Sequence, residues 1–333
     1  MPISTAAPCI PEKTIVFLKT HKTGSSTLTS ILQRYGYLRN LTFAVPEKSH
    51  VISRGYFMKA QVGSGKFDML VNHVRFNKPE MQKVMKPGAK YITILRDPRT
   101  QLESVLGYFL LFKSMNLREA DGFAKFVSNP YYYYNKCSSS FANYLRNPNL
   151  YDLGLQPNQQ KNKTLVNLFI QRISRDFDLV LINEYYNESL LLLKKLLCLS
   201  FEDILYIPKG IRSDKRRYTI SNNARESINR WCWADALLYA HFNKTFWERV
   251  RDYGPRFQDD LRYFERKLKD TILNCTIANK THDDIKHRGS DYIMNPNGDN
   301  SCSLLMKSDS KFTGIIRARQ TKKTKKKKIK NTT

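Results

Sequence analysis

The chain has 333 residues, of which 41% are hydrophobic and 12% aromatic, so it can bury the core of one large domain or two small ones. This composition excludes wholesale disorder. The formal net charge of +27 predicts anionic partners, which are nucleotides, nucleic acids or acidic membrane surfaces.

The N-terminal part predicts a strand, a polar loop and a helix in succession. Residues 14–18 (TIVFL) form a short apolar run suited to a buried parallel strand. Residues 27–35 then place apolar side chains at the spacing of a helix, and a brief apolar run follows at 69–71. This is one strand–loop–helix unit.

The same order recurs twice further along the chain. A clear strand at 91–95 (YITIL) precedes Asp97, which we expect to cap a helix that begins at Pro98 and ends near residue 112. A third strand at 179–182 (LVLI) precedes a helix over 190–199, opened by the residues 187–189. Three such units predict an α/β fold with a mostly parallel central sheet flanked by helices.

The amino-acid composition changes in the C-terminal third of the chain. Residues 220–270 carry aromatic and basic residues at helical spacing and predict amphipathic helices that cover the sheet. After residue 274 the composition shifts to Asn, Asp, Lys, Ser and Gly, which predicts a loose segment. From residue 311 onward there are ten Lys or Arg and no Asp or Glu, and we expect this basic tail to be solvated.

The first loop has the character of an anion-binding site. In the stretch IVFLKTHKTGSST (residues 15–27), small and hydroxyl-bearing residues stand between a strand and a helix, where unpaired backbone N–H groups and the helix dipole favour an anion. It does not match the Walker A pattern, because no glycine lies five residues before Gly24 and Ser25 follows Gly24 where a lysine is required. The loop therefore predicts binding of a phosphate-like anion without obvious provision for a metal.

The arrangement K-x-x-K-T-x-x-S-T after one strand, with Arg-Asp-Pro after another, resembles sulfotransferases. The stretches IVFLKTHKTGSSTLTSIL, NHVRF, ITILRDPRTQLESVLGYF and LVLINEYYNESLLLLKKLLC are similar to the galactose 3-O-sulfotransferase family, and the resemblance covers roughly residues 9–270. It implies a P-loop-like sulfotransferase fold. It also implies transfer of a sulfuryl group from 3′-phosphoadenosine 5′-phosphosulfate (PAPS) to the 3-hydroxyl of a terminal galactose on a glycolipid or glycan.

The resemblance also implies roles for particular residues. The first loop would hold the 5′-phosphosulfate through Lys19, Thr23, Gly24, Ser25, Ser26 and Thr27, and Arg96 with Ser104 would hold the 3′-phosphate. We expect Lys22 to contact the leaving phosphate and the transferring sulfuryl group. A histidine is expected to remove the proton of the sugar hydroxyl; His73 is favoured and His21 is the alternative.

The domain limits follow from these patterns. We expect a lead-in at residues 1–11, a sulfotransferase catalytic domain at 12–273 and a loose, Lys-rich tail at 274–333. No signal peptide or membrane span is predicted within the chain. The family likeness and seven N-x-S/T sequons imply a Golgi-luminal enzyme, held at the Golgi membrane by an anchor missing from this chain. The six scattered cysteines support either reduced thiols or a few disulfides rather than a zinc site.

Two other functions fit parts of the pattern. A P-loop-type kinase needs a magnesium-binding Ser or Thr after Gly-Lys and an acidic strand end, and neither is evident. A nucleic-acid-binding protein would suit the charge, but no zinc-finger, RNA-recognition or helix-turn-helix signature is present. We therefore expect no nucleic-acid partner and no required metal.

Overall fold

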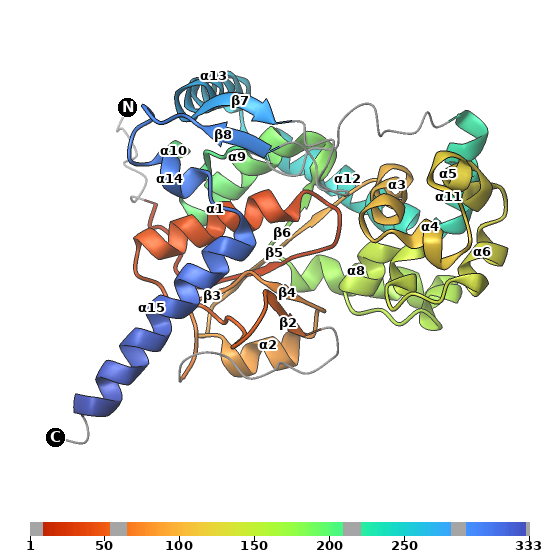
Figure 1. The fold of residues 1–333 in the computed structure, drawn as a ribbon, viewed down its shortest axis with the longest axis horizontal. Helices are drawn as coiled ribbons and strands as arrows, with labels where there is room; N and C mark the ends of the chain where they lie inside the picture. The colour runs from red at the N-terminus through yellow and green to blue at the C-terminus, as the bar shows by residue number, and fades with distance from the viewer. Residues whose placement is uncertain (1–8, 54–64, 209–220, 281–290, 331–333) are drawn as a thin grey trace, which may run out of the picture.

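The computed structural model describes residues 9–53, 65–208, 221–280 and 291–330 (Figure 1). The strands are β1 (Ile15–Leu18), β2 (Val51–Ser53), β3 (Met69–Leu70), β4 (His73–Val74), β5 (Lys90–Leu95), β6 (Leu179–Ile182), β7 (Thr276–Lys280) and β8 (Asp291–Met294). The α-helices are α1 (Ser25–Leu38), α2 (Lys78–Val84), α3 (Pro98–Tyr108), α4 (Leu111–Ser114), α5 (Glu119–Ser128), α6 (Pro130–Lys136), α7 (Pro148–Asp152), α8 (Lys163–Asp176), α9 (Tyr186–Leu197), α10 (Phe201–Ile204), α11 (Asn222–Trp231), α12 (Trp233–Tyr253), α13 (Phe257–Cys275), α14 (Cys302–Leu305) and α15 (Asp309–Lys330). The 3-10 helices are η1 (Ala142–Leu145), η2 (Gln159–Lys161) and η3 (Asn183–Tyr185).

The central sheet has the strand order β3-β1-β5-β6, and all three pairings are parallel. In the register, Ile15 lies opposite both Met69 and Lys90, and Ile92 lies opposite Leu179. The prediction of an α/β fold with a parallel central sheet flanked by helices is therefore confirmed. Because the strands are parallel, the segments after β1 and β5 emerge at the same edge of the sheet.

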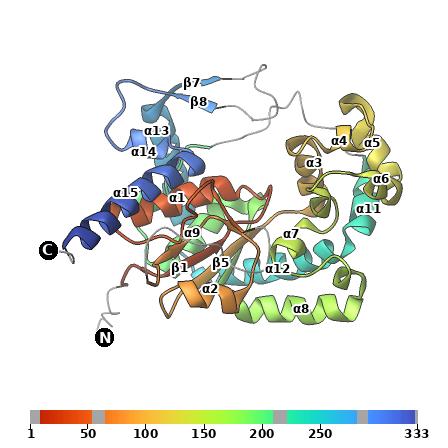
Figure 2. The same cartoon turned by 60° about the horizontal axis from the view of Figure 1, so that its bottom comes forward.

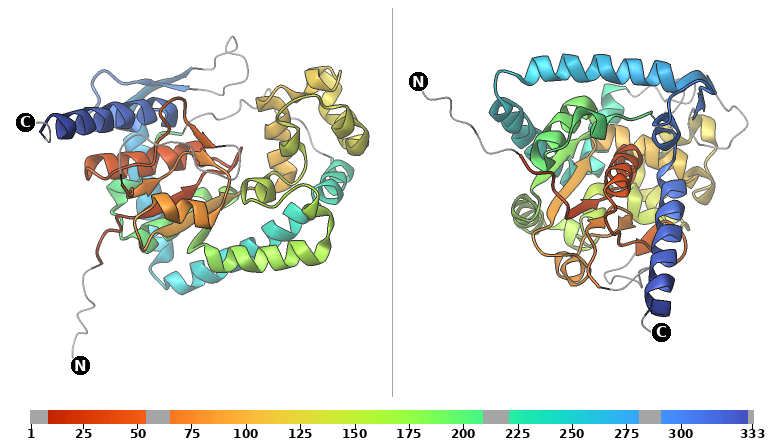
Figure 3. Two further views of the ribbon diagram at one scale, coloured as in Figure 1. Left: turned by 90° about the horizontal axis from the view of Figure 1, so that it is seen from below. Right: turned by 90° about the vertical axis from the view of Figure 1, so that its left-hand side faces the viewer.

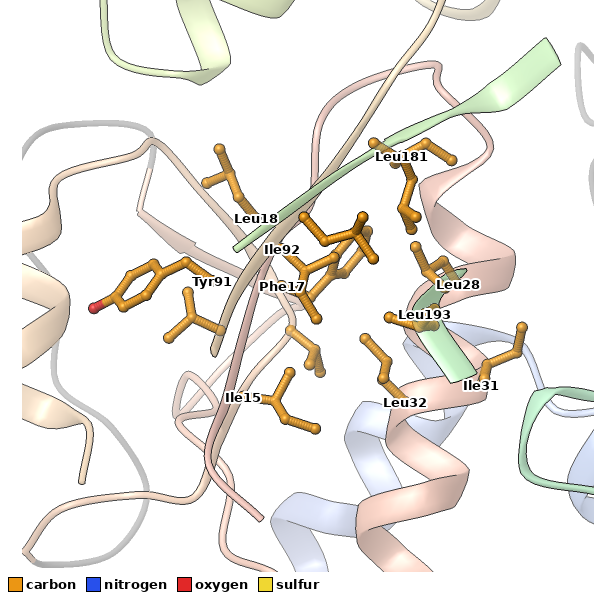
Figure 4. Packing of buried hydrophobic residues seen from close by; sticks show 14 of the residues in the cluster. Ile15, Phe17, Leu18, Leu28, Ile31, Leu32, Tyr91, Ile92, Leu181 and Leu193 are labelled. Carbon is orange, nitrogen blue, oxygen red and sulfur yellow. The ribbon is translucent and has the colours of Figure 1, made fainter. Parts of the chain in front are cut away.

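The core lies between this sheet and the helices that follow its strands. All four residues of β1 are buried, as expected for a strand covered on both faces. Figure 4 shows Leu28 and Leu32 of α1 on the side that faces the sheet, near Leu193 of α9. The apolar spacing that predicted the first helix therefore describes the face by which α1 packs on the sheet.

Two helix boundaries differ from the prediction. The helix that begins at Pro98 ends at Tyr108 rather than near residue 112, because Leu110 adopts a left-handed backbone (φ 55°) that interrupts it. The later helix begins at Tyr186, one turn before the expected start, so Asn187 lies inside α9 and does not cap it. The side chain of Asn187 instead contacts Glu265 and Tyr206.

A second group of helices stands beside the sheet. Helices α3, α4, α5 and α11 enclose a separate hydrophobic cluster, which includes Leu106, Phe126 and Trp231 (Figure 2). The aromatic residues of 220–270 therefore divide between two cores, since Phe242 and Phe246 of α12 join the main one. The prediction that this whole region covers the sheet was correct only in part.

The segment from residue 274 onward, expected to be loose, is ordered where the structure describes it. It forms the antiparallel pair β7–β8, the short helix α14 and the long helix α15, which runs along α1 (Figure 3). Phe312 and Ile316 of α15 are buried in the main core. The prediction missed this helix because its few apolar residues are diluted by lysines.

Two disulfides tie the termini to this core. Cys9 pairs with Cys198 and Cys275 pairs with Cys302. Since the first spans 189 residues of chain, we expect the double replacement Cys9→Ser/Cys198→Ser to lower the free energy of unfolding by about 4 to 5 kcal/mol. Urea unfolding measures this loss. The matched control is Cys137→Ser, outside both disulfides, and an equal loss there would contradict the prediction.

None of the helices in the described ranges has both the length and the apolarity needed to cross a bilayer.

Candidate active site

The loop between β1 and α1 is folded around Thr20. The Thr20 carbonyl accepts hydrogen bonds from the hydroxyls of Thr23 (3.3 Å) and Ser25 (2.5 Å), and the Thr20 hydroxyl donates to the carbonyl of Ile94 (2.6 Å) in β5. Thr23 and Ser25 are buried. Their hydroxyls therefore hold the loop in shape.

The first turn of α1 presents the remaining predicted loop residues. Ser26 is exposed, whereas Thr27 is buried and its N–H donates to the carbonyl of Gly24 (3.2 Å). An α-helix leaves its first N–H groups without partners inside the helix, and its dipole places partial positive charge at the same end. The turn is therefore suited to bind a phosphate or sulfate group.

Glycine is required at position 24 for two reasons, which are its backbone conformation and the lack of room for a side chain. Its φ is 76°, and a Cβ atom there would lie 2.5 Å from Oδ1 of Asn183 and 3.2 Å from the Tyr186 ring. We expect Gly24→Ala to disrupt the loop and to abolish binding of adenosine 3′,5′-bisphosphate, measured by calorimetry. Gly88→Ala is the matched control, because Gly88 has φ 77° and no atom within 4 Å of the added Cβ. Equal binding by both variants would show that the loop does not need this close approach.

The two predicted histidines lie against each other. The rings of His21 and His73 stack with centroids 4.2 Å apart and an angle of 16° between their planes. Asp152 holds His21 twice, since its carboxylate accepts from the backbone N–H (2.6 Å) and lies 2.9 Å from Nδ1. Nδ1 of His73 lies 3.1 Å from the carbonyl oxygen of Lys19, and a ring nitrogen that faces a carbonyl must carry a proton. The lone pair of His73 is therefore on Nε2.

The electrostatics keep His73 neutral. Its pKa lies well below the ordinary value of 6.5, mainly because burial disfavours the imidazolium and further because the positive charges of Lys19, His21 and His50 repel it. The hydrogen bond to the Lys19 carbonyl acts in the opposite direction but does not outweigh them. At neutral pH this histidine can accept a proton.

Lys22 and Arg96 meet at the same edge of the sheet. Nη1 of Arg96 donates to the carbonyl of Lys22 (3.2 Å), and Nε donates to Thr100 (2.9 Å). The Lys22 ammonium lies 3.6 Å from the centroid of the Tyr108 ring, a cation–π contact. Ser104 lies half-buried on α3, two turns after Arg96. The structure thus brings the two predicted anion-binding segments together.

Aromatic side chains flank the histidines on one side. His21 lies 4.3 Å from the Tyr144 ring and 6.0 Å from the Phe109 ring, measured between centroids. Phe109 in turn stacks on Phe141 at 4.3 Å. These rings give the site an apolar wall next to its positive charges, a combination suited to the carbon face of a sugar beside an anion.

A buried polar network supports this edge. Nε2 of Gln101 donates to the His21 carbonyl (2.8 Å), and Nδ2 of Asn149 donates to Gln101 (2.7 Å) and to the Arg96 carbonyl (3.2 Å). Asp235 accepts from the backbone N–H of Asn149 (2.8 Å), and burial raises the pKa of its carboxyl to about 7, although backbone hydrogen bonds oppose the shift. The network fixes the backbone that carries His21 and Arg96.

Lys19 is placed differently from the other loop residues. Its side chain is only 3% exposed, and its ammonium forms an ion pair with Asp309, the first residue of α15. Its positive charge is thus compensated from within the chain.

Sequence reasoning missed several of these partners. Asp152 lies 131 residues from His21 and Asp309 lies 290 residues from Lys19, so no local pattern connects them. No sequence pattern marks Gln101 and Asn149 as residues of the site, because single amide side chains are common in helices. Within the residues that the structure describes, no group of three or more His, Cys, Asp or Glu is arranged to hold a metal ion.

Comparison with known proteins matches residues 1–296 to the family model described as galactose-3-O-sulfotransferase. The chain is 37% identical to a galactosylceramide sulfotransferase of Mus musculus over 257 residues, which cover 75% of this chain and 60% of the relative. It is 35% identical to galactose-3-O-sulfotransferase 2 of Homo sapiens over 288 residues, covering 83% and 72% of the two chains. It is 33% identical to galactose-3-O-sulfotransferase 3 of Bos taurus over 265 residues, covering 76% and 61%. The chain thus spans about 60% of the length of the galactosylceramide sulfotransferases that it matches.

Proposed function

Because the chain belongs to the galactose-3-O-sulfotransferase family, we propose that it moves a sulfuryl group from PAPS to the 3-hydroxyl of a terminal galactose. The acceptor is a glycolipid of the galactosylceramide type or a galactose-terminated glycan, in line with the names of its relatives. The observation that carries the proposal is the stacking of His73 on His21, the residue next to Lys22, at the carboxyl end of β1.

The donor side of the site is proposed to be P-loop-like. Support comes from the strand–loop–helix order of β1 and α1, from the left-handed backbone of Gly24, and from Arg96 at the end of the neighbouring strand β5. The 5′-phosphosulfate would lie against the N–H groups of the first loop, and Arg96 and Ser104 would hold the 3′-phosphate. PAPS supplies the sulfuryl group, and the site offers it cationic and N–H donors suited to its anionic groups.

We propose the following roles for the chain's own residues, which their geometry supports. His73 accepts the proton of the 3-hydroxyl at Nε2 while the galactose oxygen forms its bond to sulfur. As the bond between sulfur and the phosphate oxygen breaks, Lys22 stabilises the negative charge on that oxygen. His21 is the alternative base, because Asp152 orients its ring through Nδ1 in the same way.

We further propose a Golgi-luminal, membrane-associated enzyme. Besides the family and the sequons, the two disulfides support an oxidising compartment.

Transfer from labelled PAPS to a panel of galactosyl lipids and galactose-terminated oligosaccharides tests the proposal, and we expect product on at least one acceptor. Adenosine 3′,5′-bisphosphate should raise the melting temperature more than ATP with magnesium does. Absence of transfer together with absence of bisphosphate binding would overturn the proposal, and the reverse ranking of the nucleotides would favour a kinase.

A further inference from the structure

Helix α15 lies outside the region matched to the family model, which ends at residue 296, yet it is built into the domain. Figures 1 and 3 show it lying against α1, which it crosses in the view of Figure 1. The apolar residues Phe312 and Ile316 lie in the core. One turn after Ile316, the side-chain amide of Gln320 pairs with the backbone of Phe43, accepting at 2.7 Å and donating at 3.0 Å. The helix is therefore docked by both apolar and polar contacts.

The first turn of α15 reaches the donor loop. Asp309 forms its ion pair with Lys19, and both side chains are largely buried, at 17% and 3% exposed. Burial alone would raise the pKa of the Asp309 carboxyl, but the charge and hydrogen bond of Lys19, with smaller contributions from the Ser310 backbone and from His50, together hold the pKa below its ordinary value. A buried ion pair of this kind fixes the position of both partners, because separation leaves an uncompensated charge.

The second turn of α15 contacts the residue that precedes the proposed base. The Thr313 hydroxyl accepts from Nδ2 of Asn72 (2.9 Å) and from Nε2 of Gln33 (2.9 Å), and donates to the Asp309 carbonyl (2.8 Å). Asn72 directly precedes His73 in the chain. Thus α15 holds the residue before His73 through Thr313, and through Asp309 it holds Lys19, whose carbonyl accepts from Nδ1 of His73.

We propose that Asp309 and Thr313 are positioning residues of the active site, which fix the orientation and tautomer of the His73 imidazole through Lys19 and Asn72. The inference rests on the proposed function for its kinetic consequence. The geometric part can be tested without turnover.

The kinetic test compares Asp309→Asn and Thr313→Val with their conservative partners Asp309→Glu and Thr313→Ser. We expect the first pair to lower kcat on the order of 10- to 100-fold at saturating substrates, with the affinity for adenosine 3′,5′-bisphosphate changed less than about threefold. The conservative variants should recover most of the rate. Gln320→Leu is the matched control, because it loosens the same helix at its bonds to Phe43 and should lower the melting temperature while leaving kcat near the wild-type value.

The second readout is the tautomer of His73, measured by ¹⁵N NMR of the histidine rings and assigned with His73→Gln. The wild type should show the Nδ1–H form, and Asp309→Asn or Thr313→Val should show a mixture. Wild-type kcat and tautomer in both variants would overturn the inference, as would an equal loss of kcat in Gln320→Leu. If the wild type transfers no sulfuryl group, the proposed function fails, and the NMR result still decides the positioning role. If Asp309→Asn does not fold, the comparison of Thr313→Val with Thr313→Ser decides the test.

Discussion

Replacement of Lys22 by alanine is expected to reduce sulfuryl transfer by about 10²- to 10³-fold or more, because it removes the cation that we propose stabilises the developing charge. The backbone of Lys22 already has a left-handed conformation (φ 61°), and its ammonium is held over the Tyr108 ring at 3.6 Å. The left-handed backbone is energetically costly for a non-glycine residue. The contact with Tyr108 keeps the Lys22 ammonium beside the loop. The measurement is kcat with labelled PAPS at saturating acceptor.

Two variants make the result specific. Lys22→Arg keeps the charge but changes its geometry, so it should retain more activity than Lys22→Ala. Lys244→Ala removes an exposed lysine on α12 and should leave kcat unchanged, which controls for the loss of one positive charge. If Lys22→Ala kept wild-type kcat, Lys22 would have no part in the chemical step.

Replacement of His73 by alanine is the second large effect, with an expected loss of about 10²- to 10⁴-fold in kcat, the usual contribution of a general base. The structure supports this choice, because Nδ1 is committed to the Lys19 carbonyl and Nε2 is left to accept the proton. His21→Ala should lower kcat less, since His21 acts as a stacked neighbour of His73. The opposite ranking would make His21 the base.

The pH dependence provides an independent check. Because the pKa of His73 is depressed, the imidazole stays neutral as the pH falls through 6.5 and is protonated only at lower pH. The acid limb of kcat/KM should therefore have its midpoint below 6.5. By linkage, the folded protein should also lose stability as the pH falls below 6.5, since the unfolded chain binds the proton more readily. An acid limb at or above 6.5 would argue against His73 as the base.

The variant Asp152→Asn distinguishes between the two candidate bases. It removes the negative charge that faces Nδ1 of His21 and leaves the contact between His73 and the Lys19 carbonyl in place. If His73 is the base, the acid limb of Asp152→Asn should stay in place or move slightly to higher pH, because a less positive His21 repels the His73 imidazolium less. A shift of the acid limb to lower pH would indicate that His21, which loses its carboxylate partner, is the base.

The sequence by itself determined the strand–loop–helix units and the nature of the first loop. These features are local: β1 is a continuous apolar run, α1 shows its buried face in its spacing, and Asp97 with Pro98 marks the start of α3. Each is fixed by backbone preferences and by the periodicity of side chains within a few residues.

Only the tertiary structure decided which distant groups meet. In the folded chain His73 stacks on His21, and the carboxylate of Asp152 contacts His21. Cys9 pairs with Cys198, and Asp309, in the segment expected to be loose, forms an ion pair with Lys19. The physical reason is that a hydrogen bond or ion pair depends on separation in space, and packing of the two hydrophobic cores sets those separations. A helix such as α15 gains most of its stability from packing against other elements rather than from its own sequence. The sequence of this segment therefore did not predict the helix, and its packing against α1 in the tertiary structure explains it.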